Sequence, residues 1–223
     1  MTLIVTTDYD FQRVQPPALP LALPEYDKAY QDQLNNVLRL YFNRLNNILN
    51  QMNTGSGAID GSGIRFPYGA FSSSQDQTTT ANTATLMTLN TTDFSNSVGL
   101  DIGSKIKVTT PGIYNLQFSA QFQNTDNQIQ DISIWLKQNG TDIAGSTGFV
   151  SIPARKSASA GEEAHEIIGW NYYLSMNADD YVQIYWSATL ASVTIQYYPS
   201  STGPTRPSTQ SVVATLSFVS ALP

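Results

Sequence analysis

The sequence contains no cysteine, so the fold must hold without disulfides, and no thiol can act as a nucleophile or a metal ligand. Charge is also sparse: charged residues make up 13% of the 223 residues, and the formal net charge is −6. Phosphate binding requires clustered Lys and Arg, whereas the closest basic groupings here are Lys105 with Lys107 and Arg155 with Lys156. The composition therefore argues against nucleic acid as the main partner.

The sequence has no long apolar run either. No stretch approaches the roughly 18 apolar residues of a membrane-spanning helix. The N-terminus, MTLIVTTDYD, lacks the basic segment of a secretory signal, and its apolar run is only Leu3-Ile4-Val5. These absences predict a soluble protein that is made in the cytoplasm.

Motifs for catalysis are missing as well. No GxSxG or HExxH motif occurs, and the one histidine, His165, has Glu162 and Glu166 as its nearest candidate co-ligands for a metal. A single histidine beside acids in an expected loop is a weak metal pattern, so we favour a surface residue. The paired acids Asp179-Asp180 are typical of a turn and not of an acid/base pair, because neighbours along a strand point to opposite faces. We therefore expect neither an enzyme nor a cofactor or metal site.

What the sequence does contain is a strong alternation of apolar and polar residues between 105 and 140. The apolar positions are Tyr114, Leu116, Phe118, Ala120 and Phe122 in one run, and Ile132, Ile134 and Leu136 in the next. A period of two predicts strands with one face in a core and one on a surface. Asn139-Gly140 then supplies the residues that a tight hairpin turn favours.

Alternation returns in later segments. These are residues 168–174, 182–186, 193–197 and 212–218, with loops expected at 72–83, 145–165 and 199–210. Many alternating strands with turns between them predict an antiparallel sandwich of two sheets over residues 66–223. The large residues opposite the expected core set are Trp135, Tyr173 and Tyr185. We interpret these aromatic side chains as a subunit interface, and packing beneath a loop is the alternative.

One long helix is expected at residues 25–53. Pro24 suits the first helical position, and Glu25 and Asp27 suit the positive end of the helix dipole. The apolar stripe of this helix consists of Tyr30, Leu34, Val37, Tyr41, Leu45, Ile48 and Met52. Such a stripe must be covered, either by a bundle of helices from three chains, which we favour, or by the chain's own sandwich.

Residues 1–24 contain the proline-rich stretch QPPALPLALP, which predicts an extended arm. A free linker would be more polar, so the arm should pack against its own helix, a sister subunit or a groove on another protein. The candidate docking residues are Pro16, Pro17, Leu19, Pro20, Leu21, Leu23 and Pro24. Residues 54–65, rich in Gly and Ser, are the expected hinge between helix and sandwich.

The sequence also resembles a known family. Pro-Gly-Ile-Tyr at 111–114 leads into an aromatic strand, and the next alternating strand ends in Leu-Lys-Gln-Asn-Gly. Residues 173–184 then give a strand, an acidic turn and an apolar strand, and 212–219 closes the series. Together these features resemble the C1q/TNF-like jelly roll. Where that family often has Gly-Asp at the acidic turn, this chain has Asp179-Asp180.

The resemblance implies a mainly β fold, a C1q/TNF-like antiparallel jelly-roll sandwich, and a homotrimer. Some domains of this kind bind calcium, for which the candidate oxygen donors are Asp126, Asp131, Asp179 and Asp180. Nothing in the sequence brings these aspartates together, so no metal site is assigned.

The order of arm, helix, hinge and knob is typical of appendages on larger particles. A secreted C1q-like protein would carry a secretion signal and a TNF-like ligand a membrane span, and this sequence shows neither. We therefore expect a bacteriophage virion protein made in the host cytoplasm, either a homotrimeric capsid decoration protein or a short head fibre. Its partners would be other proteins of the capsid or tail.

Two alternatives remain. The first is the receptor-binding knob of a tail fibre, whose loops at 72–83, 145–165 and 199–210 would bind a host surface glycan. The second is a carbohydrate-binding module that is not part of a virion. A hydrolase would need two acids facing each other across a groove, and the sequence does not indicate such a pair.

Overall fold

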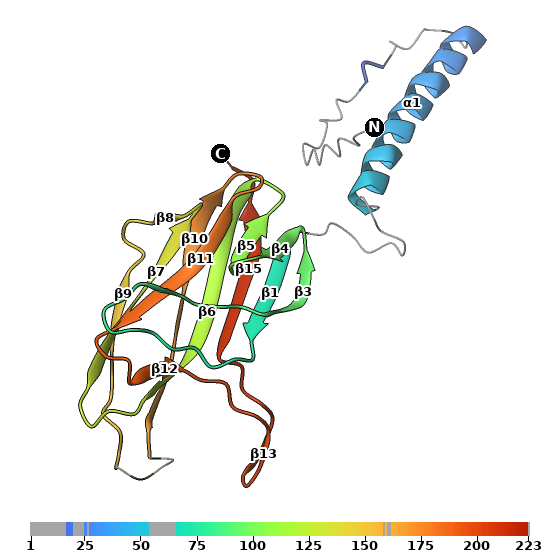
Figure 1. Cartoon of the computed structure of the whole chain (residues 1–223). Coiled ribbons are helices and arrows are strands. Elements are labelled where there is room, and N and C mark those ends of the chain that lie inside the picture. The colour runs from blue at the N-terminus through green and yellow to red at the C-terminus, as the bar shows by residue number, and fades with distance from the viewer. Residues whose placement is uncertain are drawn as a thin grey trace. The chain divides into compact units, whose positions relative to one another are not determined.

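The chain divides into two compact units, residues 1–65 and residues 66–223. We call them the helical unit and the β-domain. The computed structural model describes residues 17–19, 25, 27–53, 66–157, 159 and 162–222 (Figure 1). The expected hinge at 54–65 and most of the expected arm lie outside the described residues.

The helical unit contains α1, Lys28–Asn53. The helix begins later than the expected range of 25–53 because Asp27 is its N-cap. The Oδ1 atom of Asp27 accepts a hydrogen bond from the backbone N–H of Ala29 at 2.9 Å, and its carbonyl accepts from Gln31 N–H at 3.1 Å. A side chain that satisfies a free N–H group at this position fixes the helix start.

In the described residues of the β-domain, the regular secondary structure consists of strands. They are β1 (Tyr68–Ser73), β2 (Thr85–Leu86), β3 (Thr91–Asn96), β4 (Val98–Asp101), β5 (Lys105–Val108), β6 (Gly112–Asn124), β7 (Gln130–Gln138), β8 (Thr141–Asp142), β9 (Gly148–Ile152), β10 (Ala164–Met176), β11 (Tyr181–Ala188), β12 (Val193–Ile195), β13 (Ser201–Thr202), β14 (Thr205–Arg206) and β15 (Val212–Ser220).

The strands form two large antiparallel sheets. The six-stranded sheet has the order β10-β6-β15-β1-β3, with β12 also paired to β6. The seven-stranded sheet has the order β4-β5-β11-β7-β8, with β2 paired to β11 and β9 to β7. Most neighbours in each sheet are not consecutive along the chain, as in a jelly roll, and Figure 1 shows the sheets as two layers. The expected mainly β, two-sheet antiparallel sandwich with one N-terminal helix is confirmed.

The core lies between the two sheets. Along β6, Tyr114, Leu116 and Phe122 are almost fully buried and alternate with half-buried or exposed polar residues, as the sequence period predicts. The ring of Phe122 meets the ring of Trp186 on β11 edge-on, at 5.5 Å between centroids. The alternating segment of 105–140 therefore supplies an interior strand of one sheet and part of the other.

Part of the expected loop at 145–165 is a strand. Gly148–Ile152 forms β9, which pairs with β7 through register partners such as Ile132 with Val150. β3 was not expected either, because its sequence, TTDFSN, is almost entirely polar and exposed. Both strands exist through pairing with a neighbouring strand, which local periodicity cannot reveal.

The turn at Asn139-Gly140 is confirmed by its backbone, with φ of 52° and 82°. These left-handed values are those of a tight hairpin turn, which joins β7 and β8. The acidic turn contains a similar feature, because Asp179 has φ of 72°. Asp179 therefore takes the conformation that glycine adopts most easily.

The sandwich has two distinct ends. We call one the Phe66 end, because the β-domain begins there. At this end the carbonyl of Pro67 accepts a hydrogen bond from Phe218 N–H at 2.9 Å, and the rings of Phe66 and Phe218 stack with centroids 5.8 Å apart. The opposite end, which we call the far end, holds the end of β6 and the start of β10, paired as Asn124 with Ala164. Figure 1 shows the β13–β14 hairpin at this far end.

Candidate binding surfaces

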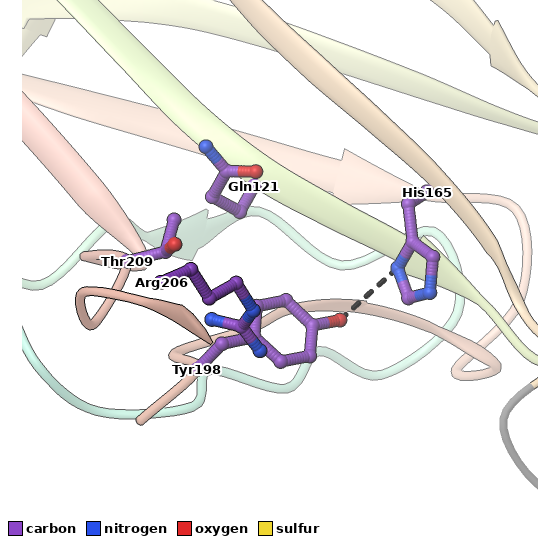
Figure 2. A pocket seen from close by; sticks show the side chains of 5 residues that line it. All are labelled: Gln121, His165, Tyr198, Arg206 and Thr209. Carbon is purple, nitrogen blue, oxygen red and sulfur yellow. Dashed lines mark hydrogen bonds between the residues drawn. The ribbon is translucent and has the colours of Figure 1, made fainter. Parts of the chain in front are cut away.

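The far end of the β-domain has a shallow pocket. It is an open hollow of about 290 Å³ lined by Gln121, His165, Tyr198, Arg206 and Thr209 (Figure 2). We call it the far-end pocket. Gln121 comes from β6 and His165 from β10, whereas the other residues belong to the segment that connects β12 to β15.

The connecting segment folds into a hairpin that holds its residues in place. Tyr198 and Thr209 exchange backbone hydrogen bonds of 3.1 and 2.8 Å at its base, and β13 pairs with β14 above them. The Nη1 atom of Arg206 donates to the carbonyl oxygens of Pro199 at 3.1 Å and Pro207 at 3.4 Å. The guanidinium is thereby tied to the backbone of its own hairpin.

Tyr198 lies at the centre of the pocket's polar contacts. Its hydroxyl is 3.0 Å from Nδ1 of His165, and the two rings meet edge-on at 5.7 Å. The Cζ atom of Arg206 lies 5.9 Å from the centre of the Tyr198 ring. Burial raises the pKa of Tyr198, and Glu163 and Asp76 raise it further, while Arg206 lowers it. The hydroxyl therefore stays protonated at neutral pH and remains able to donate.

The loops singled out in the sequence meet at this end. Asp76, in the loop at 72–83, accepts from the backbone N–H of Tyr197 at 2.8 Å. His165, at the end of the segment 145–165, contacts Tyr198 next to the loop at 199–210. Sequence reasoning named these loops but missed Gln121, Tyr198, Arg206 and Thr209. No local pattern marks these residues, because the pocket joins segments that are distant in sequence.

A second surface is the outer face of the seven-stranded sheet. Trp135 and Tyr185 are opposite each other on β7 and β11, with ring centroids 6.0 Å apart. The Nε1 atom of Trp135 donates to Asp142 at 2.8 Å, and Lys137 lies 3.2 Å from the same carboxylate and 4.7 Å from the Tyr185 ring. Phe149 on β9 is on the same face and is 78% exposed.

Tyr173, the third aromatic residue assigned to the subunit interface, lies elsewhere. It pairs with Asn115 across β10 and β6, on the outer face of the six-stranded sheet, and is 59% exposed. The structure therefore places Trp135 and Tyr185 together but puts Tyr173 on the opposite side of the sandwich. The outer face around Tyr173 carries uncharged residues, among them Asn115, Gln117, Ser119, Asn171, Thr215 and Ser217.

The described part of the apolar stripe of α1 is only partly buried. Tyr30, Leu34, Val37, Tyr41 and Leu45 are each half-buried, and from Asp27 to Asn47 no described side chain is fully buried. The side chains of Ile48 and Met52, at the end of the stripe, lie outside the described residues.

In the arm, Pro17 is half-buried and Leu19 is exposed. The remaining candidate docking residues lie outside the described residues; they are Pro16, Pro20, Leu21, Leu23 and Pro24.

The candidate calcium ligands lie in different places. Asp126 accepts from Gln130 at 2.6 Å, and Asp131 accepts from Ser151 at 2.6 Å, whereas Asp179 and Asp180 belong to the turn at the Phe66 end. Across the part of the chain that the structure describes, no group of three or more acidic or histidine side chains could hold a metal ion.

The β-domain has a C1q/TNF-like fold, and the solved structures that are similar to it include the following two. The globular domain of zebrafish complement 1qA protein is 14% identical, with a TM-score of 0.41 over 71% of this chain and 100% of that chain. The structure of Eiger TNF from S. frugiperda is 13% identical, with a TM-score of 0.45 over 71% of this chain and 96% of that chain. At this identity the likeness concerns the fold alone.

Comparisons of sequence identify neither a family nor a curated relative, because no protein-family model matches the chain and no curated protein matches it. In the described residues, no helix has both the length and the apolar character needed to cross a membrane.

Proposed function

We propose that the protein is a homotrimeric structural protein of a bacteriophage particle, either a capsid decoration protein or a short head fibre. In this proposal the N-terminal arm and helix dock on the particle, and the β-domain faces outward as a knob. The protein is made in the host cytoplasm and assembled onto the virion.

The observation that carries the proposal is the incompletely buried apolar surface of α1. No described side chain of this 26-residue helix is fully buried, and those of Leu40 and Phe42 are 53% and 59% exposed. Apolar surface of this kind is unfavourable in water, and a bundle of helices from three chains would remove it. Domains with the C1q/TNF-like fold are typically trimers, which supports the same number of chains. The order of arm, helix and knob is also typical of appendages on larger particles, which supports the proposal by analogy.

The test is to label particles from a lysate that contains the protein with gold-conjugated antibodies against the β-domain. Label over the head is the expected result, and label on no particle would refute the virion proposal. A chain without residues 1–24 should remain a folded trimer that no longer joins the particle. Continued assembly of this truncated protein would remove the docking role of the arm.

A second candidate is the receptor-binding knob of a tail fibre. The far-end pocket favours it, because this open hollow lies where loops proposed to bind a host glycan meet. Label confined to the tail in the same experiment would select this candidate. A carbohydrate-binding module outside a virion would bind glycans while leaving every particle unlabelled.

A further inference from the structure

We propose that the far-end pocket binds one uncharged sugar ring of a surface glycan. The inference is independent of the proposed place on the particle, since it concerns the chemistry of five side chains in the β-domain. It can be tested with the purified full chain, so that its failure would leave the virion proposal standing.

The first argument is the supply of hydrogen-bonding groups. Arg206 uses Nη1 for both of its bonds to backbone carbonyls, and within the described residues its Nε and Nη2 atoms have no acceptor. The amide of Gln121 and the hydroxyl of Thr209 likewise have no side-chain partner among those residues. The pocket therefore presents a fork of donors, an amide and a hydroxyl, which match the adjacent hydroxyl groups of a sugar.

The second argument is charge. Arg206 alone would favour an anion, but Glu163 and Asp76 lie close enough to act electrostatically on Tyr198. Asp76 is fixed there by its bond to the backbone of Tyr197. The two carboxylates act on the same hydroxyl as the Arg206 guanidinium and in the opposite direction, so they offset its positive charge there. An uncharged polar ligand fits this balance better than a carboxylate or phosphate.

The third argument is shape and surface. A sugar ring has a rim of hydroxyls and faces of C–H groups, so it suits a site that combines aromatic rings with polar groups. The rings of Tyr198 and His165, locked edge-on to each other, supply the aromatic component. A volume of about 290 Å³ is near the lower limit of the ~300–1,000 Å³ of ligand sites, which leaves room for one sugar ring.

The position of the pocket agrees with a glycan on a surface. At ~3.3 Å per residue, the stretch of β6 from Gly112 to Gln121 covers about 30 Å, so the pocket is far from the point where the β-domain begins. The pocket is open to solvent, and a sugar at the end of a larger glycan can reach it (Figure 2).

The experiment uses the full chain on an immobilised panel of uncharged and acidic glycans, followed by calorimetry with the best-bound glycan. We expect binding to an uncharged glycan, and at least a tenfold weaker affinity in Arg206→Ala. Tyr198→Phe keeps the ring but removes the hydroxyl, and should weaken binding less. Arg155→Ala is the matched control: this half-buried arginine also belongs to the far end but does not line the pocket, and its affinity should stay within about twofold.

Thermal unfolding of each variant shows whether it is folded. Absence of binding to every glycan on the panel would overturn the proposal. Equal losses of affinity in Arg206→Ala and Arg155→Ala would also overturn it, and so would binding restricted to acidic glycans.

Discussion

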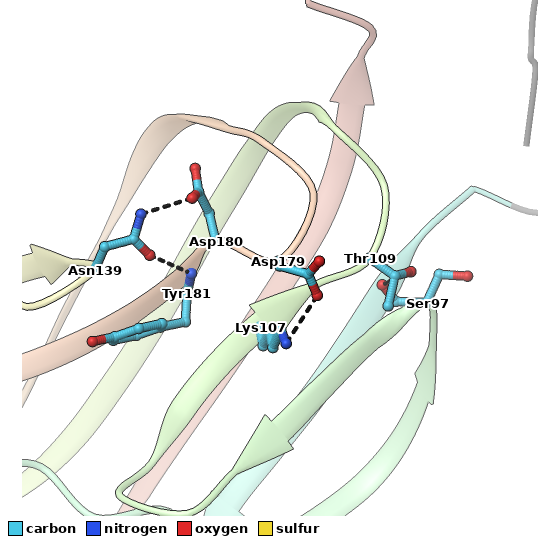
Figure 3. A network of polar contacts seen from close by, with 7 residues as sticks. All are labelled: Ser97, Lys107, Thr109, Asn139, Asp179, Asp180 and Tyr181. Carbon is cyan, nitrogen blue, oxygen red and sulfur yellow. Dashed lines mark hydrogen bonds and ion pairs between the residues drawn. The ribbon is translucent and has the colours of Figure 1, made fainter. Parts of the chain in front are cut away.

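Asn139 and Asp180, which lie in two different turns, are joined by a hydrogen bond of 2.7 Å from Asn139 Nδ2 to Asp180 Oδ1 (Figure 3). The Oδ1 atom of Asn139 in turn accepts from the backbone N–H of Tyr181 at 3.0 Å. One asparagine side chain thus links the β7–β8 turn to the start of β11. The acidic turn that resembles the C1q/TNF-like pattern therefore has a structural role, because its hydrogen bonds connect two strands.

The hydrogen bonds of the Asp180 carboxylate predict a dependence of stability on pH. Burial raises the pKa of Asp180, but the hydrogen bonds from Asn139, the backbone of Asn177 and Gln138 outweigh it and lower the pKa below its ordinary value. A lowered pKa means that the stabilisation is complete above the pKa of the unfolded chain, about 3.9, and is lost as the pH falls through the folded value.

Asp180→Asn should therefore destabilise the β-domain by about 1 kcal/mol at pH 7, since this carboxylate is partly in solvent. The difference in melting temperature from the natural sequence should shrink between pH 5 and pH 2. Asp32→Asn, on α1, is the control and should show no such difference for the β-domain. A difference for Asp180→Asn that stays constant over this range would contradict the role of the charge.

The left-handed backbone of Asp179 predicts an unusual effect of glycine. Asp179 has φ of 72°, which costs a residue with a side chain about 1 kcal/mol relative to glycine. Its ion pair with Lys107, 2.9 Å long, is open to solvent and contributes little (Figure 3). Asp179→Gly should therefore stabilise the domain by about 0.5 kcal/mol, and Asp179→Ala should destabilise it. Urea unfolding would measure both, and a clear loss of stability in Asp179→Gly would show that the ion pair outweighs the backbone strain.

Gly169 on β10 allows a close approach between strands. A Cβ atom at this position would clash with the backbone carbonyl oxygen of Phe118, which has no flexible end to move away. Gly169→Ala should therefore destabilise the β-domain by roughly 1–3 kcal/mol in urea unfolding. Gly99→Ala is a matched control in β4, because nothing lies within 4 Å of its Cβ position. Similar stabilities of the two variants would mean that β10 can shift without cost.

The sequence predicted the features that depend on local pattern. The period of two identified β6 and β7, and Asn139-Gly140 identified the hairpin, because each signal lies within a few consecutive residues. The far-end pocket could not be found in this way, since Gln121 and Arg206 come together only through the sheet and the β13–β14 hairpin. The separation of Tyr173 from Trp135 also required the sheet order, because alternation tells inside from outside but does not tell one sheet from the other.

The apolar stripe of α1, which is only partly buried, predicts that charge on it will weaken the assembly. Val37 and Tyr41 lie one turn apart on the stripe and are half-buried. In a bundle of three chains, Val37→Lys with Tyr41→Lys would place six like charges near the axis, where burial of a charge is costly.

The matched control is Asn43→Lys with Asn46→Lys, which adds the same charge at exposed positions away from the stripe. Light scattering should give the mass of three 24.4 kDa chains for the natural sequence and the control, and a lower mass or a lower helix melting temperature for the stripe variant. If the stripe variant matched the control in both measurements, α1 would not be the trimerising element, and its apolar side chains would have to be covered by the particle.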